Sequence, residues 1–468
     1  MKDLAEKIIL EILHRMGIHP QKDELEDFEN RLICGLWNKI KRERMDERLV
    51  IKNAVDSASI TLPNGRVGEQ YNAEVEFVID GVDDYEIIGL DVVGLSYEKK
   101  EKGFVVSGLT QPEDIKGGDY PLTIRYKPKG LLNNEEWLER AITFIVNPDP
   151  KTLWKNIPTP RDTEYYKDDT QMQYVKVEAA AGVPRKDIVA ASLRGRSHAH
   201  EGKPRDDHFL LHYCEETEWY LMAVADGAGS AKFSREGSLI ACETVIEHCK
   251  NALSMSDEFE KAVKTFYEDK TQIRGVYNWV YQILGNAALK AHNAIKREAE
   301  RRNTERNDST KMKDYATTLL LAICKRFEFG WAVASFWVGD GAICIYDAEK
   351  HTAEMLGMPD EGEFAGQTRF LTMPEIFADS TTFYQRLRFK IYKDFTALML
   401  MTDGVSDPKF ETDANLQNPD RWDALWKDLA DNGVELVDDN EKSQEQLLEW
   451  LNFWDRGNHD DRTIAILY

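Results

Sequence analysis

The sequence is poor in cysteine, and its cysteines form no disulfide or metal-binding pattern. Six cysteines occur among 468 residues, and no two of them are spaced as a CxxC pair. Four of the six lie inside apolar runs, where cysteine packs as a small hydrophobic side chain. So long a chain with so few cysteines is not expected to be a disulfide-stapled scaffold.

A long apolar run is also missing. No stretch approaches the roughly 18 apolar residues that a membrane-spanning helix needs. The first residues, MKDLAEKIILEILHRMG, are amphipathic and carry acids from residue 3 onward, so they lack the uninterrupted apolar segment of a signal peptide. We therefore expect a cytoplasmic protein with no membrane partner.

Basic residues are fewer than acidic residues. The chain has 60 basic and 83 acidic residues, which gives a formal net charge of −23. Such a surface repels the phosphates of nucleic acids, so nucleic-acid binding is not expected. No Walker phosphate-binding loop occurs either. The apolar content of 42% is ample for a large core. Since a domain typically has about 150 residues, a chain of 468 residues is expected to contain several domains.

Changes in pattern divide the chain into four parts. Residues 1–48 have helical periodicity, with a second helix predicted over Glu24–Arg44. Residues 49–148 contain short alternating runs separated by glycine, asparagine and proline, which predicts a small antiparallel β-sandwich. Residues 149–182 are rich in proline and polar residues and are predicted to be a linker. Residues 183–468 mix apolar strands with long helices, which indicates an α+β domain.

The predicted β-sandwich also resembles a known module. Its stretches LPNGRVGEQYNAEVEF and GLSYEKKEKGFVVSGLTQPEDIKGGDYPLTIRY are similar to the opening and close of immunoglobulin-like (Ig-like) domains of bacterial proteins. Such modules bind or space other domains and rarely catalyse reactions. The resemblance implies that this part recruits a protein partner.

Aspartates stand at the ends of several apolar strands in residues 183–468. EWYLMAVAD ends at Asp226 and FTALMLMTD ends at Asp403, while Asp206–Asp207 and Asp460–Asp461 directly precede strands. A buried carboxylate is costly unless it is neutralised, and carboxylate oxygens are the ligands that Mg²⁺ and Mn²⁺ prefer. Two such ions about 4 Å apart can bind a phosphate and activate a water. The alternative is that these acids are ordinary turn residues. That explanation is adequate for any one of the four sites, but it is weaker for all four together.

Seven blocks follow one another in this region: GRSHAHEGKPRDDHF, VADGAGSAKFSREGSLIA, ATTLL, WVGDGAICIYD, GEFAGQTRFLT, MTDGVSD and DDRTIAIL. In this order they resemble the motif series of the PPM (PP2C-type) protein phosphatases, and particularly a bacterial subset of that family. The resemblance implies a four-layer αββα sandwich with metals at one end of two antiparallel sheets. It implies a domain over residues 183–468, preceded by the helical segment and the Ig-like sandwich.

The resemblance also assigns roles. It implies two Mn²⁺ or Mg²⁺ ions held by Asp226, the Gly227 carbonyl, Asp403, Asp460 and Asp206. Asp226 would bridge both ions, and Asp206 occupies a position where the family has Glu or Gln. Asp207 would orient a water from behind these ligands.

Three departures from the family pattern matter. The phosphate-binding arginine of the family falls at Gly202 here, and Arg196, Arg205 or His198 are the candidates to replace it. Ala228 stands where some members have a histidine that acts as general acid, so water would protonate the leaving group. A third metal would use Asp314, although its register is off by one residue.

These observations predict a metal-dependent phosphatase that hydrolyses phosphoserine and phosphothreonine in proteins. Its partners would be phosphoprotein substrates and a cognate Ser/Thr kinase. The alternative is a catalytically silent phosphatase-like module that binds phosphoproteins and signals through its partners. The spacings of His198, His200, His208 and His212 would also allow a zinc site, but a satisfied or solvent-facing role is favoured for most of them. The sequence leaves open whether an inserted flap near Glu354–Phe383 restricts access.

Overall fold

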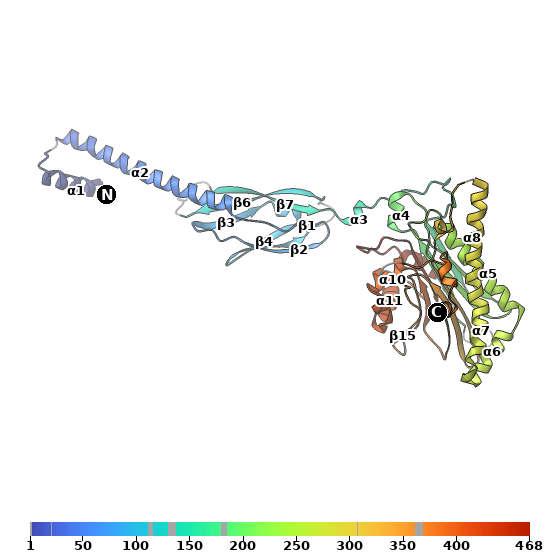
Figure 1. Ribbon diagram of the computed structural model, residues 1–468. Coiled ribbons are helices and arrows are strands. Elements are labelled where there is room, and N and C mark those ends of the chain that lie inside the picture. Colours follow the sequence, from blue (N-terminus) through green and yellow to red (C-terminus); the bar gives the residue numbers. More distant parts are fainter. Residues whose placement is uncertain are drawn as a thin grey trace. The chain divides into compact units, whose positions relative to one another are not determined.

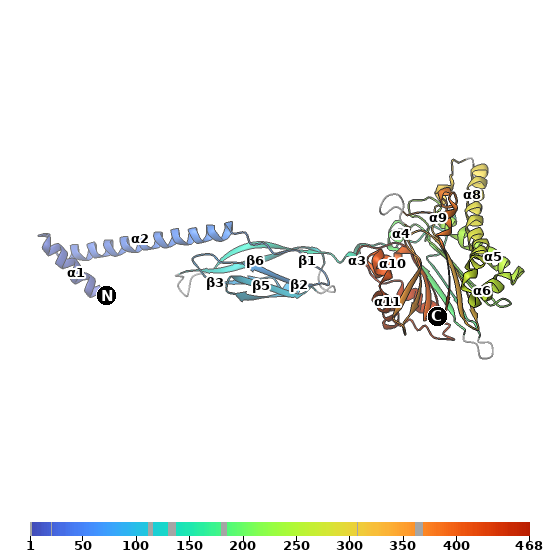
Figure 2. The same ribbon diagram turned by 60° about the horizontal axis from the view of Figure 1, so that its bottom comes forward.

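The computed structural model describes residues 2–19, 21–110, 116–129, 137–178, 185–306, 308–360 and 368–468. Its internal contacts divide the chain into two compact units, Met1–Leu153 and Trp154–Tyr468. Figures 1 and 2 show the elements of each unit from two directions. Among the described residues, no helix combines the length and the apolar composition that a bilayer-spanning segment needs.

The first unit begins with two helices, α1 (Lys2–Arg15) and α2 (Lys22–Ser57). Helix α1 is followed by Gly17, whose φ of +74° suits a residue without a Cβ atom. Helix α2 is longer than the predicted Glu24–Arg44 and passes the expected boundary at residue 48. Its end is held by Val55, which is fully buried.

The rest of the first unit consists of two small sheets. One has the order β1-β7-β6-β3 and the other the order β2-β5-β4. Side chains along β2 alternate between exposed and buried, as expected for a strand with one face on a core. The strands are β1 (Gly65–Arg66), β2 (Gln70–Glu76), β3 (Val82–Ile88), β4 (Leu95–Lys100), β5 (Gly103–Leu109), β6 (Gly118–Pro128) and β7 (Leu138–Asn147), and the short helix α3 (Pro150–Leu153) follows them.

The second unit contains two larger antiparallel sheets. The five-stranded sheet has the order β10-β11-β12-β13-β16, with β10 (His208–Cys214), β11 (Trp219–Ala225), β12 (Leu319–Phe327), β13 (Gly330–Val338) and β16 (Leu387–Tyr392). The six-stranded sheet has the order β15-β14-β17-β18-β9-β8, with β15 (Thr352–Gly357), β14 (Ala342–Asp347), β17 (Ala397–Met401), β18 (Arg462–Leu467), β9 (Ile188–Leu193) and β8 (Thr170–Val175).

Helices pack against both sheets (Figure 1). The five-stranded sheet is covered by α5 (Ser234–Met255), α6 (Glu258–Glu268), α7 (Ile273–Val280) and α8 (Asn286–Arg306). The six-stranded sheet is covered by α10 (Asp403–Phe410), α11 (Pro419–Asp431) and α12 (Ser443–Trp450). The remaining helices, α4 (Arg196–Glu201) and α9 (Ser380–Tyr384), are short.

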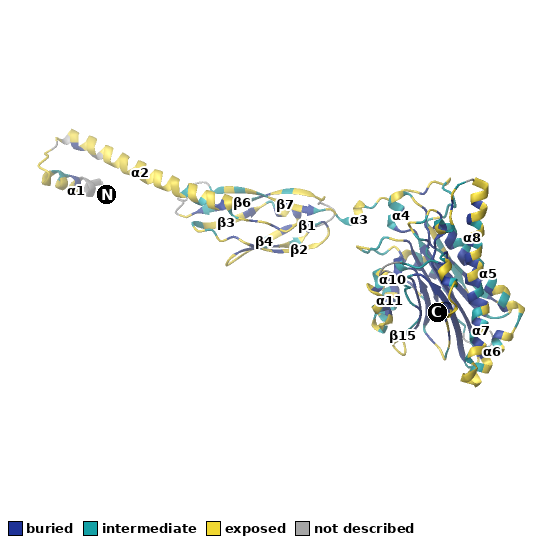
Figure 3. Ribbon diagram, viewed as in Figure 1, coloured by how far each residue is buried: buried dark blue, intermediate teal, exposed yellow. Residues whose placement is uncertain are grey.

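The apolar strands of the sequence are buried on both faces (Figure 3). Along β11, Leu221 and Ala223 point into the core beneath helices α5–α8, whereas Met222 and Val224 point into a core between the two sheets. Along β17, Met399 points into a third core beneath α10–α12. Since successive side chains of a strand face opposite sides, a strand between two cores reads as an unbroken apolar run.

Residues 154–178 of the predicted linker belong to the second unit, whereas residues 149–153 belong to the first. Residues 154–169, here called the strap, run along the domain. The strap is tied down where Ile157 N donates to Ala199 O at 2.8 Å and Arg194 donates to Thr159 Oγ1 at 2.7 Å. Strand β8 then pairs with β9, and Gln171 and Gln173 donate to carbonyls of β10.

We expect the strap and β8 to be needed for stability. A fragment that begins at Trp154 should unfold like the second unit of the full chain. A fragment that begins at Arg185 loses a paired strand and exposes the edge of β9, so its free energy of unfolding should fall by about 3 kcal/mol or more. Urea denaturation followed by tryptophan fluorescence measures both, and equal stabilities would contradict the expectation.

Candidate metal centre and active site

The predicted acids lie together because strand ends meet at one end of both sheets. Asp207 directly precedes β10 and Asp226 directly follows β11, and His208 pairs with Ala225 in the register of these strands. In the other sheet β17 ends just before Thr402-Asp403, and its Met401 pairs with Ile464 of β18 close to Asp460–Asp461. The sequence pattern of an acid beside each apolar strand therefore becomes a single site.

Three aspartates form what we call the acid cluster: Asp226, Asp340 and Asp403. Each offers a carboxylate oxygen, and these oxygens all lie within 4.8 Å of one another. All three residues are partly exposed. Oδ1 of Asp340 and Oδ1 of Asp403 are buried and have no hydrogen-bond partner among the described residues. Buried carboxylate oxygens without partners are expected to be satisfied by something else.

The electrostatics of the acid cluster point to a cation. Burial, and then the negative charges of Asp403 and Asp207, raise the pKa of Asp226 well above its usual value. Burial, and then the charges of Asp340 and Asp460, do the same to the pKa of Asp403. Crowded carboxylates without counter-charges disfavour their ionised forms. A divalent cation among them would supply the missing positive charge.

Two threonines of the ATT block hold Asp226 in place. The hydroxyl of Thr318 accepts a hydrogen bond from Asp226 N at 2.9 Å, and the hydroxyl of Thr317 donates to Asp226 O at 2.8 Å. Gly227 follows in a tight space, because a Cβ atom there would lie 2.7 Å from Asp206 O. Glycine thus lets the chain bring Asp206 and Asp226 close together.

Asp461 organises the other predicted ligands. Its buried carboxylate accepts hydrogen bonds from Gly195 N at 2.6 Å and Asp206 N at 2.5 Å, and Asp207 N lies 3.4 Å away. His198 Nδ1 lies 2.9 Å from the same carboxylate. Burial opposes ionisation of Asp461, but the charge of His198 and these hydrogen bonds lower its pKa.

His198 lies between Asp461 and Asp206. Its Nε2 is 3.5 Å from Asp206 Oδ2, and the ring is buried. Burial lowers the pKa of His198, but the charge and hydrogen bond of Asp461 outweigh it and bring the pKa to about 9. Burial and the charge of Asp461 raise the pKa of Asp206 to about 6. His198 therefore contacts both carboxylates, and its predicted part in phosphate binding stays a prediction. Asp460 lies close to His198 and Asp461 and is exposed.

Asp207 is fixed from behind. Its Oδ2 accepts hydrogen bonds from Thr402 Oγ1 at 3.0 Å and from Thr463 Oγ1 at 2.6 Å. Its buried Oδ1 has no partner among the described residues. That free oxygen fits the predicted role of orienting a water. Burial, and then the charge of Asp461, raise the pKa of Asp207 to about 7.

The two arginine candidates for phosphate binding are occupied elsewhere. Arg205 is buried, and its guanidinium donates to Ser192 Oγ at 2.6 Å, Asp207 O at 2.8 Å, and acceptors on Asp168 and Gln171. Arg196 donates to carbonyls near the end of the chain and lies over the ring of Trp454. The hydrogen bonds of Arg205 fix the backbone at Asp207, which is a positioning contact, and its role in phosphate binding stays a prediction.

Asp340 is a site residue that sequence reasoning missed, whereas Asp314 is not brought to the acid cluster. The Asp314 carboxylate accepts a hydrogen bond from Lys311 N at 2.7 Å, at the start of a short 3₁₀ helix. Asp340 comes just after β13, as Asp226 comes just after β11. Its position after an apolar strand could therefore have identified it from the sequence. Of the histidines in residues 198–212, only His198 joins a group with metal-binding geometry among the described residues. Residues 362–367 of the GEFAGQTRFLT block and residues 361–367 of the predicted flap lie outside the described residues.

The donor set fits a hard divalent cation. It consists of carboxylate oxygens, several of them without partners, and contains neither cysteine nor more than one histidine. Oxygen ligands of this kind suit Mg²⁺ and Mn²⁺ better than zinc or copper. The fully hydrogen-bonded Asp461 has little left to offer an ion, which leaves the acid cluster, Asp206 and Asp460 as the residues able to hold one or more.

Comparison with known proteins gives one family match and several similar solved structures. Residues 194–452 match the family model of protein phosphatase 2C. No curated protein sequence is significantly similar to the chain. Similar solved structures include a bacterial serine phosphatase (13% identity, TM-score 0.37, covering 60% of this chain and 96% of that one) and the serine/threonine phosphatase Stp1 from Staphylococcus aureus (13%, 0.36, 63% and 98%). Another is RsbX in complex with magnesium (15%, 0.33, 64% and 100%). Because the family model matches more than half of the sequence, the chain belongs to the protein phosphatase 2C family.

Proposed function

We propose that this protein is a metal-dependent phosphatase of phosphoserine and phosphothreonine in proteins. The observation that carries the proposal is the acid cluster, in which three carboxylates converge at one end of two sheets. The ligands would be Asp226, the Gly227 carbonyl, Asp403, Asp460 and Asp206, with Asp340 as an addition. Divalent ions held there would activate a water for attack on phosphorus and neutralise charge on the phosphoryl oxygens.

The remaining site residues act through position. Asp207, held by Thr402 and Thr463, presents its free oxygen to a water beside the ligands. His198 and Asp461 fix the carboxylate and the backbone of Asp206. Ala228 carries no proton donor, so the leaving serine or threonine would take its proton from water.

The wider architecture suits this proposal. The cores beneath α5–α8, between the sheets and beneath α10–α12 support a four-layer αββα sandwich with the acids at one end. The β strands of the first unit support an Ig-like module, and we propose that this unit recruits the phosphoprotein or its kinase.

Metal removal is the direct test. With Mn²⁺ or Mg²⁺ the full chain should release phosphate from a phosphothreonine peptide. With EDTA the release should fall by at least about a hundredfold, because the acids alone cannot activate water. Restoring Mn²⁺ should restore the activity. Phosphate release is measured colorimetrically, with a non-phosphorylated peptide as the blank.

The same experiment addresses the rival function. Absence of release from a folded, Mn²⁺-loaded chain on several phosphopeptides would contradict the proposal. It would favour a phosphatase-like module that binds phosphoproteins without hydrolysing them. The missing arginine at Gly202 and the aspartate at position 206 support that rival. The presence of Asp226, Asp403 and Asp460 argues against it.

A further inference from the structure

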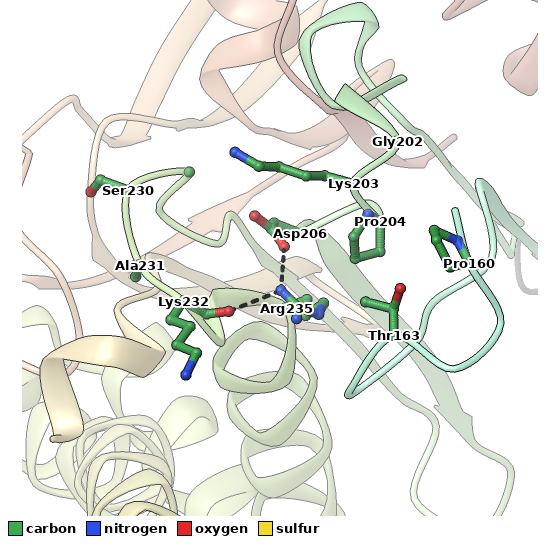
Figure 4. Close-up of a pocket in the computed structure, with 11 residues that line it drawn as sticks. Pro160, Thr163, Gly202, Lys203, Pro204, Asp206, Ser230, Ala231, Lys232 and Arg235 are labelled. Carbon is green, nitrogen blue, oxygen red and sulfur yellow. Dashed lines mark hydrogen bonds and ion pairs between the residues drawn. The ribbon is translucent and has the colours of Figure 1, made fainter. Parts of the chain in front are cut away.

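A cavity of about 460 Å³ opens beside Asp206 (Figure 4). Three segments form its wall. They are the strap at Pro160 and Thr163, the chain from Gly202 to Asp206, and the loop from Gly229 that leads into α5. Sites for small ligands have volumes of this order. The cavity is larger than one phosphoryl group requires, so it has room for a further group of a substrate.

The cavity is cationic on an acidic protein. Among the described residues its lining includes Lys203, Lys232 and Arg235 and one acid, Asp206. Lys203 is also paired with Glu201, whose Oε2 lies 2.5 Å from its Nζ. The chain as a whole has a formal net charge of −23. A hollow lined by one sign of charge attracts ligands of the opposite sign. The cavity is therefore suited to an anion.

Arg235 is held in a fixed orientation at the inner wall. Its Nε and Nη2 donate to Glu164 O at 3.0 and 2.9 Å, and its Nη1 donates to Lys232 O at 3.1 Å. Nη1 also lies 3.7 Å from Asp206 Oδ1. The remaining N–H groups of the guanidinium have no hydrogen-bond partner among the described residues. An arginine held in this way binds carboxylate or phosphate with little loss of entropy.

The cavity lies to one side of the predicted metal ligands. Asp206 lines it, whereas Asp226, Asp403 and the other members of the acid cluster do not. A phosphoryl group held at the acid cluster would therefore leave the cavity open to a neighbouring part of the same peptide. If Asp206 binds a cation, its charge is taken up, and Arg235 is then more available to an incoming anion.

We propose that the cavity, which we call the cationic pocket, binds a second negatively charged group of the substrate beside the phosphorylated residue. This inference rests on the proposed phosphatase function. The second group is a carboxylate or a phosphate, since either fits the Arg235 guanidinium in a lining that also contains Lys203 and Lys232. The substrate class is therefore phosphopeptides with acidic or doubly phosphorylated sequences.

Substrate preference tests the proposal. Three phosphothreonine peptides are compared with Mn²⁺ on the full chain, one with neutral flanks, one with glutamate flanks and one with a second phosphothreonine. The native chain should show kcat/KM about tenfold higher for at least one of the two anionic peptides than for the neutral one. Which peptide benefits distinguishes a carboxylate from a phosphate as the natural ligand.

Variants assign the preference to the pocket. Lys232→Ala and Arg235→Gln should each reduce the ratio between anionic and neutral peptides at least threefold, by roughly the worth of one charge contact. Lys427→Ala removes the same charge from an exposed position on α11 and should leave the ratio unchanged. Lys232 is exposed, so its variant carries the test even if Arg235→Gln fails to fold.

Two results would overturn the inference. One is a native chain that does not distinguish the anionic peptides from the neutral one. The other is a loss in Arg235→Gln of equal size on all peptides and on para-nitrophenyl phosphate, which would place Arg235 at the reacting phosphoryl group. If no peptide is hydrolysed, the proposed function fails, and fluorescence anisotropy of labelled peptides still decides whether the pocket prefers anionic sequences.

Discussion

Asp226→Asn is expected to lower kcat/KM on a phosphothreonine peptide by about a thousandfold in Mn²⁺. Asp226 stands at the centre of the site, with Asp403 and Asp340 on one side and Asp206 drawn close through Gly227. An amide has one neutral oxygen in place of a charged carboxylate, so it would be a much weaker ligand for the divalent ions proposed to bind there. Phosphate release measured over a range of Mn²⁺ concentrations gives the size of the loss.

The same substitution should not destabilise the fold without metal. Burial and the charges of Asp403 and Asp207 disfavour the ionised form of Asp226. Removing that charge relieves the repulsion, so the melting temperature in EDTA should stay equal or rise. The increase in melting temperature that Mn²⁺ gives the native chain should largely disappear, because the ligand set is broken.

Asp314→Asn is the matched control for this prediction. It makes the same chemical change at an acid whose carboxylate accepts a bond from Lys311 N, away from the acid cluster. Activity should change by less than about threefold, and stability by at most about 1 kcal/mol. The prediction for Asp226 would be contradicted if both variants lost activity equally, or if Asp226→Asn unfolded in EDTA.

The ends of the strands could be predicted from the sequence, because each strand is an apolar run that stops at an acidic residue. In a run such as EWYLMAVAD, successive side chains point into two different cores. The first polar residue after the run marks the place where both cores end. The same reasoning applies to β17 and Asp403. Antiparallel pairing then brings such ends together, so four separate acid sites in the sequence indicated a single site.

Residues placed by tertiary contacts were harder to predict. Asp340 follows an apolar strand too, but the Gly-Asp-Gly sequence around it also predicts a hairpin turn. Arg205 stands next to Asp206 in the sequence, yet its guanidinium turns to Ser192 and Asp168. Arg235 reaches the pocket only because the strap supplies Glu164 O, which lies 71 residues away in the chain.

The strap and β8 carry no pattern that sequence reasoning can recognise. Residues 154–169 are polar and rich in proline, as linkers are, and β8 is only partly buried. Their order comes from hydrogen bonds to the domain, such as those of Arg194 with Thr159 and Asn156. The extension of α2 to Ser57 is similar, because the burial of Val55 in the first unit sets where it ends.

Among the substitutions, Asp461→Ala should have the largest effect on stability, a loss of about 3 kcal/mol in the free energy of unfolding. The carboxylate is fully buried and accepts hydrogen bonds from Gly195 N and Asp206 N. Alanine leaves those N–H groups without a partner and leaves the ring of His198 without its counter-charge. Urea denaturation in EDTA measures the loss. If the free energy of unfolding falls with urea concentration at the same slope as in the native chain, both proteins undergo the same unfolding transition.

Activity should fall in the same variant for a different reason. Asp461 fixes the backbone of Asp206 and, through His198, also its carboxylate, so its removal leaves a predicted ligand free to move. Loss of such an outer support typically reduces activity by about 10- to 100-fold. Asp461→Asn keeps one acceptor oxygen and should lie between alanine and the native residue in both measurements. If Asp461→Ala were as stable as the native chain, the buried carboxylate would not be organising this site, and the positions of Asp206 and His198 would have to be maintained by the metal alone.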